Sequence, residues 1–100
     1  MLVRMVKMTF REDAVETFKA FFEERKDTIR NFEGCTHLEL WQDNNDRNVF
    51  FSYSHWHDET ALSHYRNSAF FRDTWQQTKQ MFSAKAEAWS MNQLVVLPRT

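Results

Sequence analysis

The sequence predicts an α+β fold with the element order β-α-β-β-α-β, and its two central strands give the first evidence. Residues 35–42 alternate between apolar positions such as Leu38 and polar positions such as Glu39, as expected for a strand with one buried face. Residues 49–56 are aromatic and β-branched, which also favours a strand. The polar residues 43–48 lie between them as a turn. We therefore expect an antiparallel hairpin.

The outer strands are predicted near the two ends of the chain. Residues 2–10 carry apolar side chains on both faces, and residues 89–97 form a second apolar run that ends at Pro98. This order suits a ferredoxin-like sandwich, which is a four-stranded antiparallel sheet with helices on one face. The other face is also largely apolar, so we expect two such sheets to pack face to face.

The first helix is predicted from apolar residues, Phe22 among them, that recur at helical spacing over residues 15–29. Asp13 and Glu16 resemble a capping box at its start. Gly34, the only glycine, is placed for a left-handed turn after its end. A long amphipathic helix should therefore precede the hairpin.

The strand that ends at Trp56 leads directly into a second helix. Asp58 can accept the free amide hydrogens of a helix that begins at the next residue. On that helix Leu62 and Tyr65 share a face, and His64 lies on or beside it. We expect His64 to point inward, either as a core histidine bonded to a carbonyl or as a functional group.

A further helix is predicted after a new cap at Ser68, with Phe71, Trp75 and Phe82 on one face. Aromatic residues from several elements could together form a flat pocket for a planar ligand, although ordinary core packing is the alternative for each. These residues are Trp41, Trp56, Tyr65, Trp75 and Trp89.

Length and composition exclude several classes of function. A chain of 100 residues forms one domain and has no room for a separate cofactor domain. With 13 basic and 14 acidic residues mixed along it, the chain has no basic surface for nucleic acid. No apolar run approaches the roughly 20 residues that span a bilayer. One glycine cannot build the turns that bind the phosphates of nicotinamide, flavin or ATP cofactors.

Cysteine and histidine usage also bears on metals and location. The single Cys35 excludes an intramolecular disulfide and multi-cysteine metal sites, and it suits a reducing cytoplasm. His55, His57 and His64 could approach one ion, but the sequence identifies no convergent third ligand or supporting acceptors. We expect no metal site, and interpret His55 and His57 as polar residues at a strand end.

Residues 53–71 resemble the antibiotic biosynthesis monooxygenase family of small dimeric α+β barrels. In that family the third strand ends in Trp, followed by an acidic or small cap, an Ala-Leu or Ala-Phe pair, a His, and a Ser with Phe or Leu after it. The matching residues are Trp56, Asp58, Ala61, Leu62, His64, Ser68 and Phe71. Length and element order agree, so the resemblance extends over nearly the whole chain, as a single domain of residues 1–100.

The resemblance implies a homodimer through the sheet face and a cofactor-independent oxygenase. In such a reaction a hydroxylated aromatic or quinol is deprotonated, and the anion reduces dioxygen directly. His64 would act as base or as a donor to the anion. The residues implied to bind the substrate are Trp56, Tyr65, Trp75, Phe71 and Phe22.

Three other functions stay open at this point. A non-catalytic barrel that binds a small molecule would have nearly the same sequence. The haem-degrading branch of the fold relies on an Asn in the first strand, but the first asparagine here is Asn31, and Tyr65 and Trp75 occupy its helical Trp and His positions. An RNA-recognition module shares the element order and would use Phe51 and Tyr53, but the basic residues are scattered.

Overall fold

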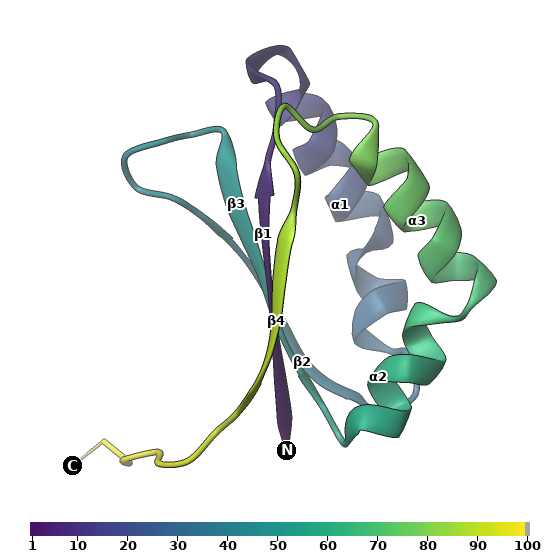
Figure 1. The fold of residues 1–100 in the computed structure, drawn as a ribbon, viewed down its shortest axis with the longest axis vertical. Coiled ribbons are helices and arrows are strands. Elements are labelled where there is room, and N and C mark those ends of the chain that lie inside the picture. Colours follow the sequence, from purple (N-terminus) through teal and green to yellow (C-terminus); the bar gives the residue numbers. More distant parts are fainter. Residues whose placement is uncertain (100) are drawn as a thin grey trace.

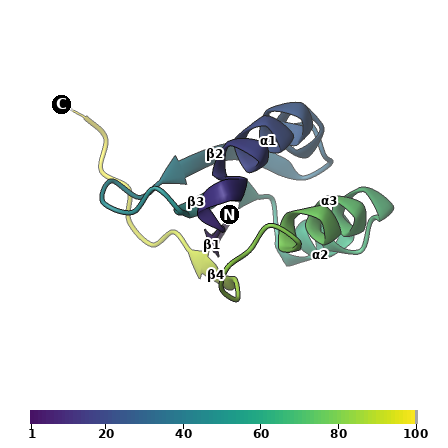
Figure 2. The same cartoon turned by 90° about the horizontal axis from the view of Figure 1, so that it is seen from above.

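A computed structural model describes residues 1–99 and confirms the predicted α+β fold. Within these residues, four strands form one antiparallel sheet in the order β2-β3-β1-β4, and three α-helices cover one of its faces (Figure 1). The elements are β1 (Leu2–Thr9), α1 (Val15–Arg30), β2 (Cys35–Gln42), β3 (Val49–Trp56), α2 (Glu59–Arg66), α3 (Ala69–Lys79) and β4 (Glu87–Asn92). Viewed from above, α1 lies on the side of β2, and α2 and α3 lie on the side of β4 (Figure 2).

The central hairpin has the predicted bounds, but the last strand does not. Strands β2 and β3 pair antiparallel as expected. Strand β4 begins earlier than predicted and ends at Asn92, leaving residues 93–99 outside the sheet. The reason is the length of its partner, because Asn92 pairs with Leu2 and β1 begins there. The prediction of a strand over residues 89–97 is therefore wrong in its bounds.

Two of the three predicted helix caps are confirmed. Asp58 Oδ1 accepts a hydrogen bond from the Ala61 amide at 2.8 Å, and Ser68 Oγ accepts one from the Phe71 amide at 3.1 Å. The capping box at Asp13 is wrong. A 3-10 turn (Glu12–Ala14) precedes α1, so Asp13 lies inside a turn, and its carboxylate pairs with Arg11 at 3.2 Å. Helix α1 therefore begins without a side-chain cap.

Gly34 has the left-handed conformation that its position predicted, with φ of +88°. Its carbonyl accepts a hydrogen bond from the His57 amide at 2.8 Å. A Cβ at this residue would lie less than 3.0 Å from the Cβ of Ala61 on α2. Glycine thus allows α2 to approach the start of β2 closely.

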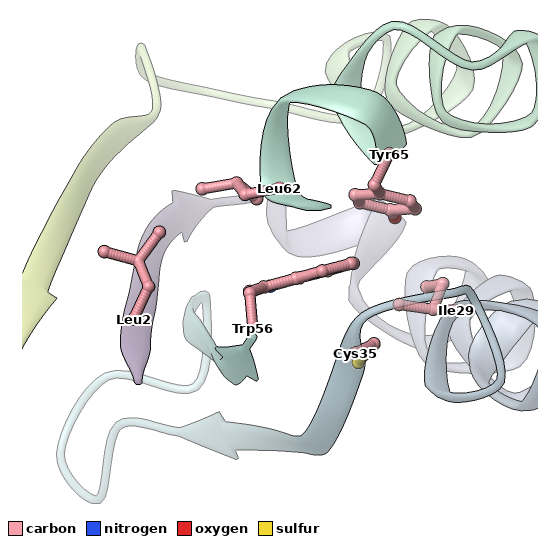
Figure 3. Close-up of a cluster of buried hydrophobic side chains, with 6 residues drawn as sticks. All are labelled: Leu2, Ile29, Cys35, Trp56, Leu62 and Tyr65. Carbon is pink, nitrogen blue, oxygen red and sulfur yellow. The ribbon is translucent and has the colours of Figure 1, made fainter. Parts of the chain in front are cut away.

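The core consists of two clusters between the sheet and the helices. The first joins the start of β1 and the end of β3 to α1 and α2 (Figure 3), and contains Leu2, Ile29, Cys35, Trp56, Leu62 and Tyr65. The second lies toward the other end of the sheet, and contains Met8, Phe10, Val15, Phe18 and Phe50. Among residues 1–99, no helix is long and apolar enough to cross a membrane.

Candidate functional site

A cavity of about 210 Å³ lies between the sheet and the helices, where side chains from both core clusters line it. Its floor is the inner face of the sheet, on which small residues of β3 and β4 lie on either side of β1. Ser52 on β3 and Ala88 on β4 flank Val6 of β1. A sheet packs closely against helices only when large side chains fill the space between them. The small residues therefore leave the room that the cavity occupies.

The structure places all five predicted substrate-binding residues around this cavity. They come from four elements: Phe22 from α1, Trp56 from β3, Tyr65 from α2, and Phe71 and Trp75 from α3. The Trp56 and Tyr65 rings stack with centroids 4.8 Å apart, and the Phe71 and Trp75 rings lie parallel within 11°. Aromatic rings therefore form much of the cavity wall, and binding of a ligand by these residues stays a prediction.

Two tryptophans that were predicted to belong to this pocket lie elsewhere. Trp41 and Trp89 are on the outer face of the sheet, 41% and 43% exposed. Trp41 pairs with Phe51, and Trp89 pairs with Met5, at positions that alternate with those facing the helices. The grouping is therefore wrong for these two, because successive strand residues point to opposite faces.

His64 does not point inward. Its side chain is exposed and lines an open hollow beside the end of α1, where its ring lies 6.1 Å from that of Phe32. The helix explains this orientation, because Leu62 and Tyr65 face the sheet and a helix turns by about 100° per residue. The inward orientation was wrong, and the catalytic role of His64 stays a prediction.

Burial and nearby charge determine the protonation state of the Tyr65 phenol and therefore its possible chemical role. Burial raises the pKa of the Tyr65 phenol well above its ordinary value, and the nearby Cys35 adds to the effect. The phenol is therefore protonated at neutral pH. In the cavity it can donate a hydrogen bond to a ligand but cannot act as a base.

Two arginines in the cavity lining were missed by the sequence analysis. Arg4 is half-buried on β1 and donates a hydrogen bond from Nη1 to Ser90 Oγ at 3.0 Å. Arg66 ends α2 and is exposed at the cavity. Burial lowers the pKa of Arg4, and the charge of Arg66 lowers it further, against an opposing effect of Glu59. The sequence did contain a signal for this site, because Arg4 is a charged residue on the same strand face as the apolar Val6.

The polar side-chain groups of the described lining are guanidinium, hydroxyl and indole N–H groups. The residues that carry them are Arg4, Arg66, Ser52, Ser54, Tyr65, Thr74, Thr78, Trp56 and Trp75. No carboxylate, imidazole or thiol lines the cavity among residues 1–99. Nor do these residues contain a group of three His, Cys, Asp or Glu that could hold a metal ion. The cavity thus offers hydrogen-bond donors and positive charge to a ligand.

A second cluster of polar and aromatic residues lies on the outer face of the sheet. Glu39 accepts a hydrogen bond from Trp41 Nε1 at 2.8 Å and contacts His37. His55 Nε2 lies 2.6 Å from the hydroxyl of Tyr53, whose ring stacks on Trp41. His55 therefore faces away from the cavity.

Comparisons with known proteins agree with this architecture. No curated protein matches the chain in sequence. A crystal structure of an antibiotic biosynthesis monooxygenase has 17% identity and a TM-score of 0.88, with 95% of this chain and 100% of that chain covered. Rv0793 from Mycobacterium tuberculosis has 14% identity and a TM-score of 0.86, with 97% of this chain and 98% of that chain covered.

A third similar structure is a mutant form of SnoaB, a cofactor-independent oxygenase from Streptomyces nogalater. It has 14% identity and a TM-score of 0.87, with 98% of this chain and 97% of that chain covered. At such identities the structures show a shared fold. The sequence pattern of the antibiotic biosynthesis monooxygenases matches residues 1–77. The chain therefore belongs to the antibiotic biosynthesis monooxygenase family.

Proposed function

We propose that this protein is a cofactor-independent monooxygenase that oxidises a small hydroxylated aromatic or quinol with dioxygen. The carrying observation is a cavity with stacked aromatic walls and donor groups, in a chain whose family supports a monooxygenase-like function. The cavity volume of about 210 Å³ is below the roughly 300–1,000 Å³ of sites for drug-sized ligands. It suits a ligand of one or two rings and is too small for a flavin or a haem.

The proposed reaction converts a phenol and dioxygen into a quinone and water. The phenol loses its hydroxyl proton, and the anion gives an electron pair from a ring carbon to dioxygen, forming a carbon–oxygen bond and a peroxide. Loss of water from the peroxide breaks the oxygen–oxygen bond and leaves the second carbonyl. One oxygen atom enters the product and the other leaves as water. The substrate supplies all the electrons.

The side chains of this cavity would stabilise the anion rather than remove its proton. Phe71 and Trp75, whose parallel rings are partly exposed, offer a surface for the ring, and the protonated Tyr65 phenol can donate to the anionic oxygen. Because the described lining contains no base, we propose that the substrate proton passes to water at the cavity mouth. The predicted role of His64 as base is the competing assignment.

Oxygen consumption with hydroquinones and hydroxynaphthalenes, in the presence of a chelator, tests the proposal. Tyr65→Phe should slow the substrate-dependent reaction roughly 10- to 100-fold, since a hydrogen bond to a charged group contributes about 1.5–3 kcal/mol. The chain's other tyrosine, Tyr53, lies on the outer face, so Tyr53→Phe is a matched control that should keep the rate.

Three outcomes of this test separate the alternatives. Absence of substrate-dependent uptake in the wild type would refute the oxygenase, and ligand binding without uptake would indicate a non-catalytic binding protein. Loss of activity in His64→Ala, with full activity in Tyr65→Phe, would instead make His64 the base.

We also propose that the protein is a homodimer through the outer face of the sheet. Support comes from large apolar side chains that this face leaves partly exposed, including Trp41, Trp89 and Met91. Exposed apolar surface of this kind is typical of an interaction site. Analytical ultracentrifugation should show a dimer for the wild type and a monomer for Trp89→Glu. A monomeric wild type at micromolar concentration would refute the proposal.

A further inference from the structure

Two guanidinium groups lie at one end of the cavity. Arg4 comes from the start of β1, and Arg66 is the last residue of α2. In the sheet, Arg4 lies between Ser54 of β3 and Ser90 of β4, so a hydroxyl-bearing residue flanks it on each side. Both arginines line the same cavity as the stacked Trp56 and Tyr65 rings. Positive charge and an aromatic surface therefore meet in one site.

No carboxylate pairs with these two guanidinium groups. Among residues 1–99, Arg11, Arg25 and Arg47 each have an acidic partner within 4.0 Å. Within the same residues Arg4 and Arg66 have none, like Arg30, Arg72 and Arg99, but only Arg4 and Arg66 line the cavity. The direction of the Arg4 pKa reflects this, since burial and the charge of Arg66 outweigh the opposing effect of Glu59. Arginine nevertheless keeps its proton in proteins. Two positive charges without an ion-pair partner, beside an apolar cavity, would be stabilised by an anion.

We propose that the ligand of this cavity carries a carboxylate on its aromatic ring, held by Arg4 and Arg66. This inference rests on the proposed function, because it narrows the substrate to an acidic hydroxylated aromatic of one or two rings. The planar guanidinium group matches a carboxylate with two parallel hydrogen bonds. The ring would then extend from the arginines past Tyr65 toward Phe71 and Trp75, in the apolar part of the cavity.

Binding of two matched bicyclic probes tests the proposal without any oxidation. The probes are 1-hydroxy-2-naphthoate and 1-naphthol, which share the ring and the hydroxyl and differ in the carboxylate. By titration calorimetry at neutral pH, we expect the wild type to bind the carboxylate roughly 10- to 100-fold more tightly, as charge-assisted hydrogen bonds predict. Equal affinities for the two probes would overturn the proposal.

Substitutions of the two arginines test whether the preference for the carboxylate probe arises in the cavity. Arg66→Gln and Arg4→Gln should each weaken binding of the naphthoate by about tenfold, and should change binding of 1-naphthol by less than about twofold. Arg4→Lys should keep part of the preference, because the charge remains but the planar fork is lost. Because Arg66 is exposed, Arg66→Gln should fold even where Arg4→Gln does not.

The matched control is Arg72→Gln, which removes one positive charge from an exposed site on α3 outside the cavity lining. It should leave both affinities unchanged. An equal loss of naphthoate binding in Arg72→Gln and Arg66→Gln would show attraction by overall charge and would overturn the proposal.

Oxygen uptake separates this inference from the proposed function. Arginine-dependent binding of 1-hydroxy-2-naphthoate, without oxygen uptake on the same compound, would support the anionic ligand and refute the oxygenase. Oxygen uptake on 1-naphthol with formation of the quinone, and with no effect of a carboxylate on binding or rate, would support the oxygenase and overturn the anionic ligand.

Discussion

The substitution Gly34→Ala should destabilise the fold strongly, because two separate costs add. The backbone at Gly34 has φ of +88°, and a residue with a Cβ in the left-handed region costs roughly 1–2 kcal/mol. The new Cβ would also lie less than 3.0 Å from the Cβ of Ala61, which has no rotamer to move it away. Overpacking of this kind costs roughly 1–3 kcal/mol. The expected loss is therefore roughly 2–5 kcal/mol in the free energy of unfolding.

Urea unfolding followed by tryptophan fluorescence measures this loss, and a double-mutant cycle divides it. Ala61→Gly alone should cost about 1 kcal/mol through helix propensity. In that background Gly34→Ala no longer meets a methyl group, so only the backbone cost of roughly 1–2 kcal/mol should remain. An equal cost in both backgrounds would refute the role of the Ala61 contact. A loss below about 0.5 kcal/mol in the wild-type background would refute the whole argument.

Two further predictions concern a helix cap and a histidine. Asp58→Ala should lower the free energy of unfolding by about 1 kcal/mol, measured by urea unfolding, because the Ala61 amide loses its acceptor; an unchanged value would contradict this role of the cap. Burial lowers the pKa of His55 below its ordinary value of 6.5, and the charge of His37 adds to this against Glu39. The unfolded chain therefore binds the proton more readily, so stability should fall as the pH decreases through about 6.5. His55→Gln should flatten that fall in urea unfolding between about pH 7.5 and 5.5, and an equal slope in both proteins would contradict the prediction.

Local patterns predicted the elements whose determinants are also local. The hairpin bounds followed from alternation and a polar turn, and the caps at Asp58 and Ser68 followed from residue type and position. The end of β4 did not follow, because it depends on where β1 begins. A strand ends where its partner ends, and a partner distant in sequence is not visible in a local pattern.

The aromatic walls of the cavity were predicted from helical spacing and family resemblance, but the cavity itself depends on small side chains in the sheet. Ser52 and Ala88 come from different strands, and only the order β3-β1-β4 places them on either side of Val6. Arg4 and Arg66 also come together only in the fold, because β1 and α2 are distant in sequence. The predicted orientation of His64 was wrong by the rotation of one helical residue, because its neighbour Tyr65 takes the inward position.

In the proposed reaction, the positive charge of the cavity affects how readily the substrate gives electrons to dioxygen. A phenol reduces dioxygen readily only as its anion, and the described lining contains donors but no base. Positive charge near the bound hydroxyl would lower its pKa, because an opposite charge favours the ionised form. The rate should then rise with pH and level off at a pH below the pKa of the free phenol. In Arg66→Gln that levelling should move to higher pH, whereas loss of a histidine base would lower the rate without that shift. Equal pH profiles for Arg66→Gln and the wild type would refute this link between the arginines and the ionised substrate.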